Sequence, residues 1–151
     1  MNWLLRSKSL QAVFRRATDS AKDYQQECGS LHVLLHLFDD PAFIASKVLQ
    51  NCHVNKDRLL DRVIAEIEKY PQVLLEEPVM TPGLIQIMDK AWGIAQEDDN
   101  SNIDTAHVLW AMTQCGSVMP TIAKLDQLVC PCRCKLLALR HSPKPRTEAR
   151  G

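Results

Sequence analysis

Histidines are the side chains whose spacing in this sequence comes nearest to a reactive site. His32 and His107 each stand two residues after a Ser or Thr, at the start of an apolar run, and His36 follows His32 by four residues. Histidines four apart can hold zinc on one helix face, but Val33 stands where a metalloprotease helix carries its glutamate. We therefore predict that each paired histidine bonds through a ring nitrogen to nearby backbone, and that no metal is bound.

A run of cysteines near the carboxyl end is the second candidate for chemistry. Cys130, Cys132 and Cys134 alternate with other residues, whereas structural zinc sites usually pair two Cys-x-x-Cys knuckles. The residues that follow contain prolines and scattered arginines with little to bury. We predict a flexible tail over residues 129–151; the alternative is a metal or thiol enzyme centred on this run, which metal analysis of protein purified without chelator would test.

Charge balance and motifs argue against a nucleic-acid-binding protein and against a phosphate-loop nucleotide site. Lys and Arg together number 18 and so do Asp and Glu, so no overall field attracts nucleic acid or an acidic membrane. Short acidic runs at 76–77 and 97–99 are typical of solvated loops, and there is no Gly-x-x-x-x-Gly-Lys-Ser/Thr phosphate loop. We predict a protein without catalytic residues or cofactor that binds neither nucleic acid nor membrane.

The start of the chain bears on its compartment. The six cysteines and the lack of a signal-peptide pattern favour the cytoplasm, with reduced thiols. No apolar run approaches the roughly 20 residues needed to cross a bilayer. Residues 1–18 are basic and contain no acid, as in a mitochondrial transit peptide, so an organellar matrix is the alternative.

An internal repeat organises the chain. Sliding the sequence by 74 residues lays one apolar stripe on another, with every position staying apolar. The first stripe is Leu10, Val13, Phe14, Ala17 and Ala21, and the second is Leu84, Ile87, Met88, Ala91 and Ala95. The spacing of both is that of an amphipathic helix, and the alanines permit close approach of a neighbouring helix. When the offset is increased by one residue, residues 30–34 match residues 105–109.

Helix signals complete the expected architecture. Ser30 and Thr105 are predicted N-caps, and Thr81-Pro82 predicts another helix start. Further helices are expected at about 43–52, 56–69 and 120–128, the second of them ending at Tyr70-Pro71. The prediction is an all-α fold of seven helices: two pseudo-symmetric repeats of a short helical bundle packed into one compact domain. Its divisions are repeat one at about 9–54, a linker helix and loop at 55–80, and repeat two at 81–128.

The matched segments resemble a known family. Residues 9–128 are similar to the double Clp repeat of the N-terminal domain of Clp-type AAA+ unfoldases, most specifically at residues 30–35, 105–109 and 78–84. Residues 69–73 look like the disaggregase branch (ClpB), whereas residues 38–41 and Ala91-Trp92 look like the type VI secretion branch (ClpV). The resemblance implies a non-catalytic domain that captures protein substrates, adaptors or sheath proteins for a hexameric AAA+ ring. The alternative is a standalone accessory protein that docks on a Clp complex.

One departure from the family suggests how a partner is recognised. Many members carry Glu between the Ser/Thr and the His, and in one branch those carboxylates clamp phosphorylated arginine; here the positions are Leu31 and Ala106. Neither can accept a charge-assisted hydrogen bond, which favours an apolar groove between the repeats. The residues predicted to line it are Trp3, Leu4, Leu5, Ser7, Leu31, Val79, Met80 and Ala106.

Overall fold

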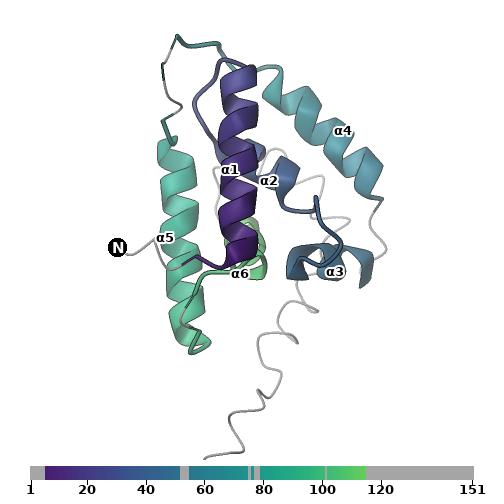
Figure 1. Cartoon of the computed structure of the whole chain (residues 1–151), viewed down its shortest axis with the longest axis vertical. Coiled ribbons are helices and arrows are strands. Elements are labelled where there is room, and N and C mark those ends of the chain that lie inside the picture. Colours follow the sequence, from purple (N-terminus) through teal and green to yellow (C-terminus); the bar gives the residue numbers. More distant parts are fainter. Residues whose placement is uncertain (1–5, 52–54, 75, 77–78, 101, 115–151) are drawn as a thin grey trace, which may run out of the picture.

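Six helices make up the regular structure of this computed structural model, which describes residues 6–51, 55–74, 76, 79–100 and 102–114. They are α1 (Lys8–Asp23), α2 (Ser30–His36), α3 (Ile44–Asn51), α4 (Lys56–Ile67), α5 (Pro82–Glu97) and α6 (Thr105–Gln114) (Figure 1). Within those ranges the β-structure consists of two isolated bridges. The all-α prediction is confirmed, and the expected helix at 120–128 lies outside the described residues.

The two repeats share details that periodicity alone does not require. α1 and α5 each contain 16 residues, and the hydroxyls of Ser7 and Thr81 cap them by accepting a backbone N–H three residues later. Both helices also end in the same Schellman motif, with Gln25 and Asp99 at φ 57°. In each, the next amide bonds back to the carbonyl of a buried alanine, Gln26 to Ala21 and Asn100 to Ala95, as the predicted duplication requires.

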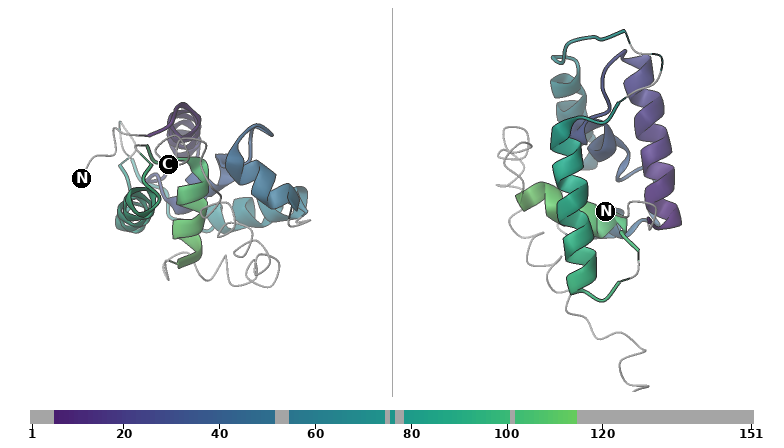
Figure 2. Two further views of the ribbon diagram at one scale, coloured as in Figure 1. Left: turned by 90° about the horizontal axis from the view of Figure 1, so that it is seen from below. Right: turned by 90° about the vertical axis from the view of Figure 1, so that its left-hand side faces the viewer.

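The halves exchange backbone hydrogen bonds in a reciprocal way. Arg6, before α1, pairs with Ile103, before α6, and Cys28, before α2, pairs with Met80, before α5. These two bridges, called here the first and second seams, are related by the duplication. Because α1 and α5 run in opposite directions (Figures 1 and 2), the seams lie at opposite ends of this helix pair.

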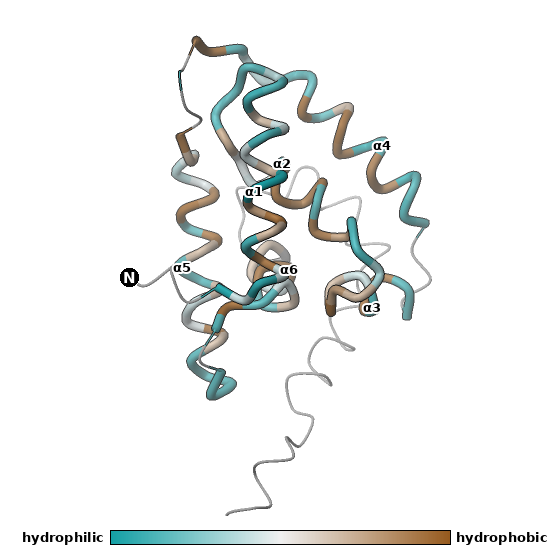
Figure 3. Tube along the Cα trace, viewed as in Figure 1, coloured by the Kyte–Doolittle hydropathy of each residue, from teal (hydrophilic) through white to brown (hydrophobic). Residues whose placement is uncertain are grey.

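One hydrophobic core joins the repeats. α2 lies at its centre and packs on α1, α4 and α5, while α6 packs on α5 and α3. The alanines of the predicted stripes are fully buried, as are Leu10, Leu84, Ile87 and Met88. Each large apolar side chain buried in this way stabilises the fold by about 1.5–3 kcal/mol. Hydrophobic residues consequently line the inward sides of the helices, and polar residues cover the outside (Figure 3).

The predicted N-caps of the second helices are wrong by one residue. Ser30 and Thr105 are the first residues of α2 and α6, and the preceding residues, Gly29 and Asp104, lead into the helices. In the second repeat, the hydroxyl of Thr105 accepts a hydrogen bond from the amide of Ala45, which ties α6 to α3. The acceptors at these helix starts come instead from the histidines.

Candidate protein-binding surface

His32 and His107 cap their own helices from within. Nδ1 of His32 accepts the Gly29 N–H at 3.0 Å, and Nδ1 of His107 accepts the Asp104 N–H at 2.8 Å. Burial, and to a smaller degree the charge of His36, lowers the pKa of His32 to about 4, so its ring is neutral near pH 7. The predicted hydrogen bonds between the histidine rings and the backbone are confirmed. They occupy the Nδ1 atoms, which stabilise the starts of the two helices.

Ser20, His36 and Asp39 form a hydrogen-bonded row in the same order as the Ser-His-Asp triad of a serine hydrolase. Nε2 of His36 lies 2.6 Å from the Ser20 hydroxyl, and its Nδ1 lies 2.6 Å from Asp39 Oδ2. Ser20 stands inside α1, however, where backbone N–H groups bond to the preceding turn and cannot stabilise an oxyanion. We interpret the row as a tie between α1 and the α2–α3 loop, reinforced by Arg16 at 3.4 Å from Asp39.

Metal binding finds no support in the described ranges. They contain no group of three or more His, Cys, Asp or Glu able to hold an ion. Cys28, the cysteine described as free, is buried, and burial raises the pKa of its thiol to about 11 despite a hydrogen bond with Thr18. Such a thiol is protonated and inert at neutral pH. Cys130, Cys132 and Cys134 lie outside the described residues.

The residues predicted for the groove divide between the two seams. Ser7 lies at the first seam, where its hydroxyl donates to Asp104 Oδ1 at 3.0 Å, and the half-buried Ala106 follows on α6. Val79 and the half-buried Met80 lie at the second seam, at the other end of the α1/α5 pair. The structure therefore does not bring the two sets together into one groove.

Exposure separates the predicted groove residues further. Val79 is 56% exposed and open to a partner, whereas Leu31 is 2% exposed and part of the core. Leu31 faces the core because α2 is packed on three helices and has little free surface. Trp3, Leu4 and Leu5 lie outside the described residues. A binding role for the predicted groove residues stays a prediction. We no longer include Leu31 in it, because that side chain is buried.

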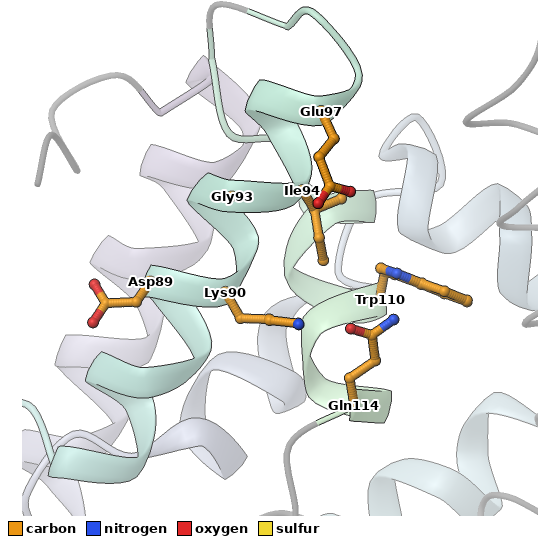
Figure 4. Close-up of a pocket in the computed structure, with 7 residues that line it drawn as sticks. All are labelled: Asp89, Lys90, Gly93, Ile94, Glu97, Trp110 and Gln114. Carbon is orange, nitrogen blue, oxygen red and sulfur yellow. The ribbon is translucent and has the colours of Figure 1, made fainter.

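A hollow between α5 and α6 was not predicted from the sequence. Its volume is about 170 Å³ and its lining comes from both helices (Figure 4). Gly93 opens it, because a Cβ atom added there would meet nothing within 4 Å. The lining residues are Asp89, Lys90, Gly93, Ile94, Glu97, Trp110 and Gln114. A glycine inside an otherwise strong amphipathic helix was the sequence signal that could have indicated this site.

Polar and charged side chains make up most of the lining of the hollow, and Ile94 and Trp110 add apolar atoms. Ile94 and Trp110 are 4% and 5% exposed, so the surface they offer is confined to the hollow. Lys90 reaches from α5 toward α6, while Asp89 points away from the other labelled side chains (Figure 4). Enclosed cavities of about 150 Å³ accept a group the size of benzene, so this space is large enough for one side chain of a partner.

Comparison with protein families identifies this pair of helical repeats. Residues 6–122 match the family described as Clp repeat (R) N-terminal domain. The chain belongs to the Clp repeat N-terminal domain family. The predicted resemblance is thereby confirmed over most of the chain. No curated protein sequence matches it.

Solved structures share the fold of this Clp repeat domain at low identity. The Hsp104 N-terminal domain from Candida albicans is 18% identical with a TM-score of 0.80, covering 92% of this chain and 93% of that chain. The N-terminal domain of the ClpV1 ATPase from E. coli EAEC is 16% identical with a TM-score of 0.71, covering 87% and 86%. A ClpV N-domain in complex with a VipB peptide is 14% identical with a TM-score of 0.66, covering 93% and 91%.

These neighbours agree with both branches that the sequence resembles. Their identities are low enough that they establish the Clp N-domain fold and nothing finer. In the part of the chain that the structure describes, no helix has the length and apolar character to span a membrane.

Proposed function

We propose that this Clp repeat domain is a non-catalytic module that binds segments of partner proteins through the α5–α6 hollow. The observation that carries the proposal is the hollow itself, which lies open beside Gly93 and has Ile94 and Trp110 in its lining, in the fold of peptide-binding relatives. In a Clp-type system the bound segments belong to substrates, adaptors or sheath proteins, and a AAA+ ring acts on them.

The size of the hollow sets the expected contribution to affinity. Burial of one large apolar side chain is worth about 1.5–3 kcal/mol, which corresponds to roughly a tenfold to hundredfold change in Kd. The rim carries both signs of charge, so a partner with an apolar anchor flanked by polar residues fits better than a highly charged one. Recognition thus depends on the anchor.

A filled hollow tests this proposal. In Gly93→Leu the new side chain projects into the open space and should weaken binding of an anchor-bearing peptide, or of unfolded protein, at least tenfold. The duplication supplies the matched control, because the equivalent position on α1 is the exposed Asp19. Asp19→Leu should leave Kd unchanged. Fluorescence anisotropy would measure binding, and circular dichroism would confirm that both variants are folded.

Two outcomes contradict the proposal. One is a folded wild-type chain that shows no saturable binding to unfolded protein or to any helical or extended peptide of a broad panel. The other is binding that Gly93→Leu and Asp19→Leu weaken equally, because the α5–α6 hollow would then have no special role.

A further inference from the structure

Exposed hydrophobic side chains collect on the connector between α4 and α5. Among the described residues five large hydrophobics are exposed, and three of them are Tyr70 (39%), Leu74 (95%) and Val79 (56%). All three belong to the short connection that follows α4 and leads to Thr81. We call them together the connector surface. Apolar residues gathered in this way, rather than scattered singly, are characteristic of interaction sites.

Hydrogen bonds hold the connector surface against the α1–α2 loop. The side-chain amide of Gln26 donates to the Tyr70 carbonyl at 3.4 Å, and the Cys28 N–H donates to the Val79 carbonyl at 2.8 Å. Between them, the Val73 N–H donates to the Gln25 carbonyl at 2.7 Å. The apolar side chains are thus presented from anchored backbone, which lowers the entropic cost of binding a partner. The segment from α4 to α5 that carries them runs past the end of α1 (Figure 1).

Carboxylates lie close, along the chain, to the connector surface and to the residues that anchor it. Glu68 and Glu76 are exposed and stand two residues from Tyr70 and Leu74 in the sequence. Asp23 and Glu27 are exposed and flank α1–α2 loop residues that bond to the connector. Lys69, the cation nearest to Tyr70 along the chain, already pairs with Glu66 at 3.1 Å. The chain as a whole has a formal net charge of zero, so this acidic character is local.

We propose that the connector surface docks a second kind of protein segment, one that carries apolar side chains beside Lys or Arg. Apolar residues at the centre and carboxylates at the rim complement such a segment and repel an acidic one. The site is separate from the α5–α6 hollow, since the connector leads to the first turn of α5 and the hollow follows its second half. It goes beyond the proposed function and does not depend on it.

A pair of matched peptides tests the connector surface on the full chain. Both are amphipathic, with the same leucines on one face; one carries lysines on the other face and its partner carries glutamates at the same positions. The wild-type chain should bind the lysine peptide at least tenfold more tightly in fluorescence anisotropy. Equal affinity for the two peptides would overturn the proposal.

Two double variants locate the binding. Leu74→Ser with Val79→Ser should weaken the lysine peptide at least fivefold, and Glu68→Lys with Glu76→Lys should abolish the preference between the peptides. All four side chains are exposed, so the fold should survive these changes.

Matched controls use exposed positions elsewhere. The apolar control is Ile85→Ser on α5, and the charge control is Asp19→Lys with Asp61→Lys; neither should change the affinity. Gly93→Leu should also leave the lysine peptide unaffected, which separates this surface from the hollow. The proposal would be contradicted if the apolar variant bound the lysine peptide as tightly as wild type, if the charge variant kept the wild-type preference, or if Gly93→Leu removed the binding.

Discussion

In both repeats a histidine caps the start of the second helix through Nδ1, but the Nε2 atoms of the two histidines have different neighbours. In repeat one, Nε2 of His32 lies 2.9 Å from the side-chain oxygen of Gln26, whose amide donates to the Ile67 carbonyl at the end of α4. In repeat two, Nε2 of His107 lies 3.3 Å from Asn100 and 3.8 Å from a carboxylate oxygen of Asp98. The duplication has thus kept the cap and let the second contact diverge.

Burial makes the first histidine the more consequential one. His32 is fully buried on the central helix α2, and its network joins α2 to α4. His107 is 8% exposed, close to a carboxylate that can stabilise positive charge. Repeat one therefore uses its histidine as a neutral core bridge, while repeat two keeps its histidine next to a charged partner.

The largest expected effect comes from removing each histidine in turn. His32→Ala leaves the Gly29 N–H and the Gln26 side-chain oxygen without partners in the core and should lower the free energy of unfolding by about 3 kcal/mol. His107→Ala should cost about half as much, roughly 1.5 kcal/mol, because water can reach the half-buried Asp104. Urea unfolding would measure both. Equal losses would mean that the bridge to α4 adds nothing to the cap.

The pH dependence of stability sharpens the same contrast. The folded pKa of His32, about 4, lies below its unfolded value of about 6.5, so the unfolded chain binds more protons in acid. The stability contributed by the neutral ring is present above pH 6.5 and is lost as the pH falls toward 4. By pH 4.5 the loss should reach about 2.5 kcal/mol.

Comparison with His32→Gln isolates this contribution from the carboxylates that also titrate in acid. The difference in unfolding free energy between wild type and variant, obtained from urea curves between pH 7 and pH 4.5, should shrink by that amount. A difference that stays constant over this range would show that His32 is not held neutral by its burial.

The sequence predicted the repeat because each helix must bury one stripe, and such stripes survive duplication as a readable period. The stripes of α1 and α5 were assigned residue by residue, and those residues are buried. The second helix starts were missed by one residue because the acceptor comes from His32 or His107, inside the helix, whereas local rules look for it at the preceding Ser or Thr.

Features that depend on contacts between distant segments could not be predicted. The groove residues divide between two seams because α1 and α5 are antiparallel, an arrangement that no local pattern encodes. Gly93 was visible as an unusual helical residue, but the Trp110 side chain across the hollow was not. Likewise, the sequence indicates only a linker in the connector, and the hydrogen bonds to the α1–α2 loop that hold it in place are visible only in the structure.

The smallest expected effect compares the hydroxyl caps of the two long helices. Ser7 and Thr81 accept equivalent amides, from Leu10 and Leu84, so replacement by Ala should cost about 1 kcal/mol at Thr81. Ser7→Ala should cost about 1.5 kcal/mol, because the Ser7 hydroxyl also donates to the Asp104 carboxylate across the first seam.

Aspartate at the same two positions separates the cap from the seam. Aspartate caps as well as serine does, so Thr81→Asp should unfold at nearly the wild-type urea concentration. Ser7→Asp would instead set a second carboxylate against Asp104, where the hydroxyl now lies at 3.0 Å, and should be less stable than Ser7→Ala. If both aspartates were equally tolerated, the Ser7–Asp104 bond would carry no weight in joining the repeats, and the seams would rest on their backbone hydrogen bonds alone.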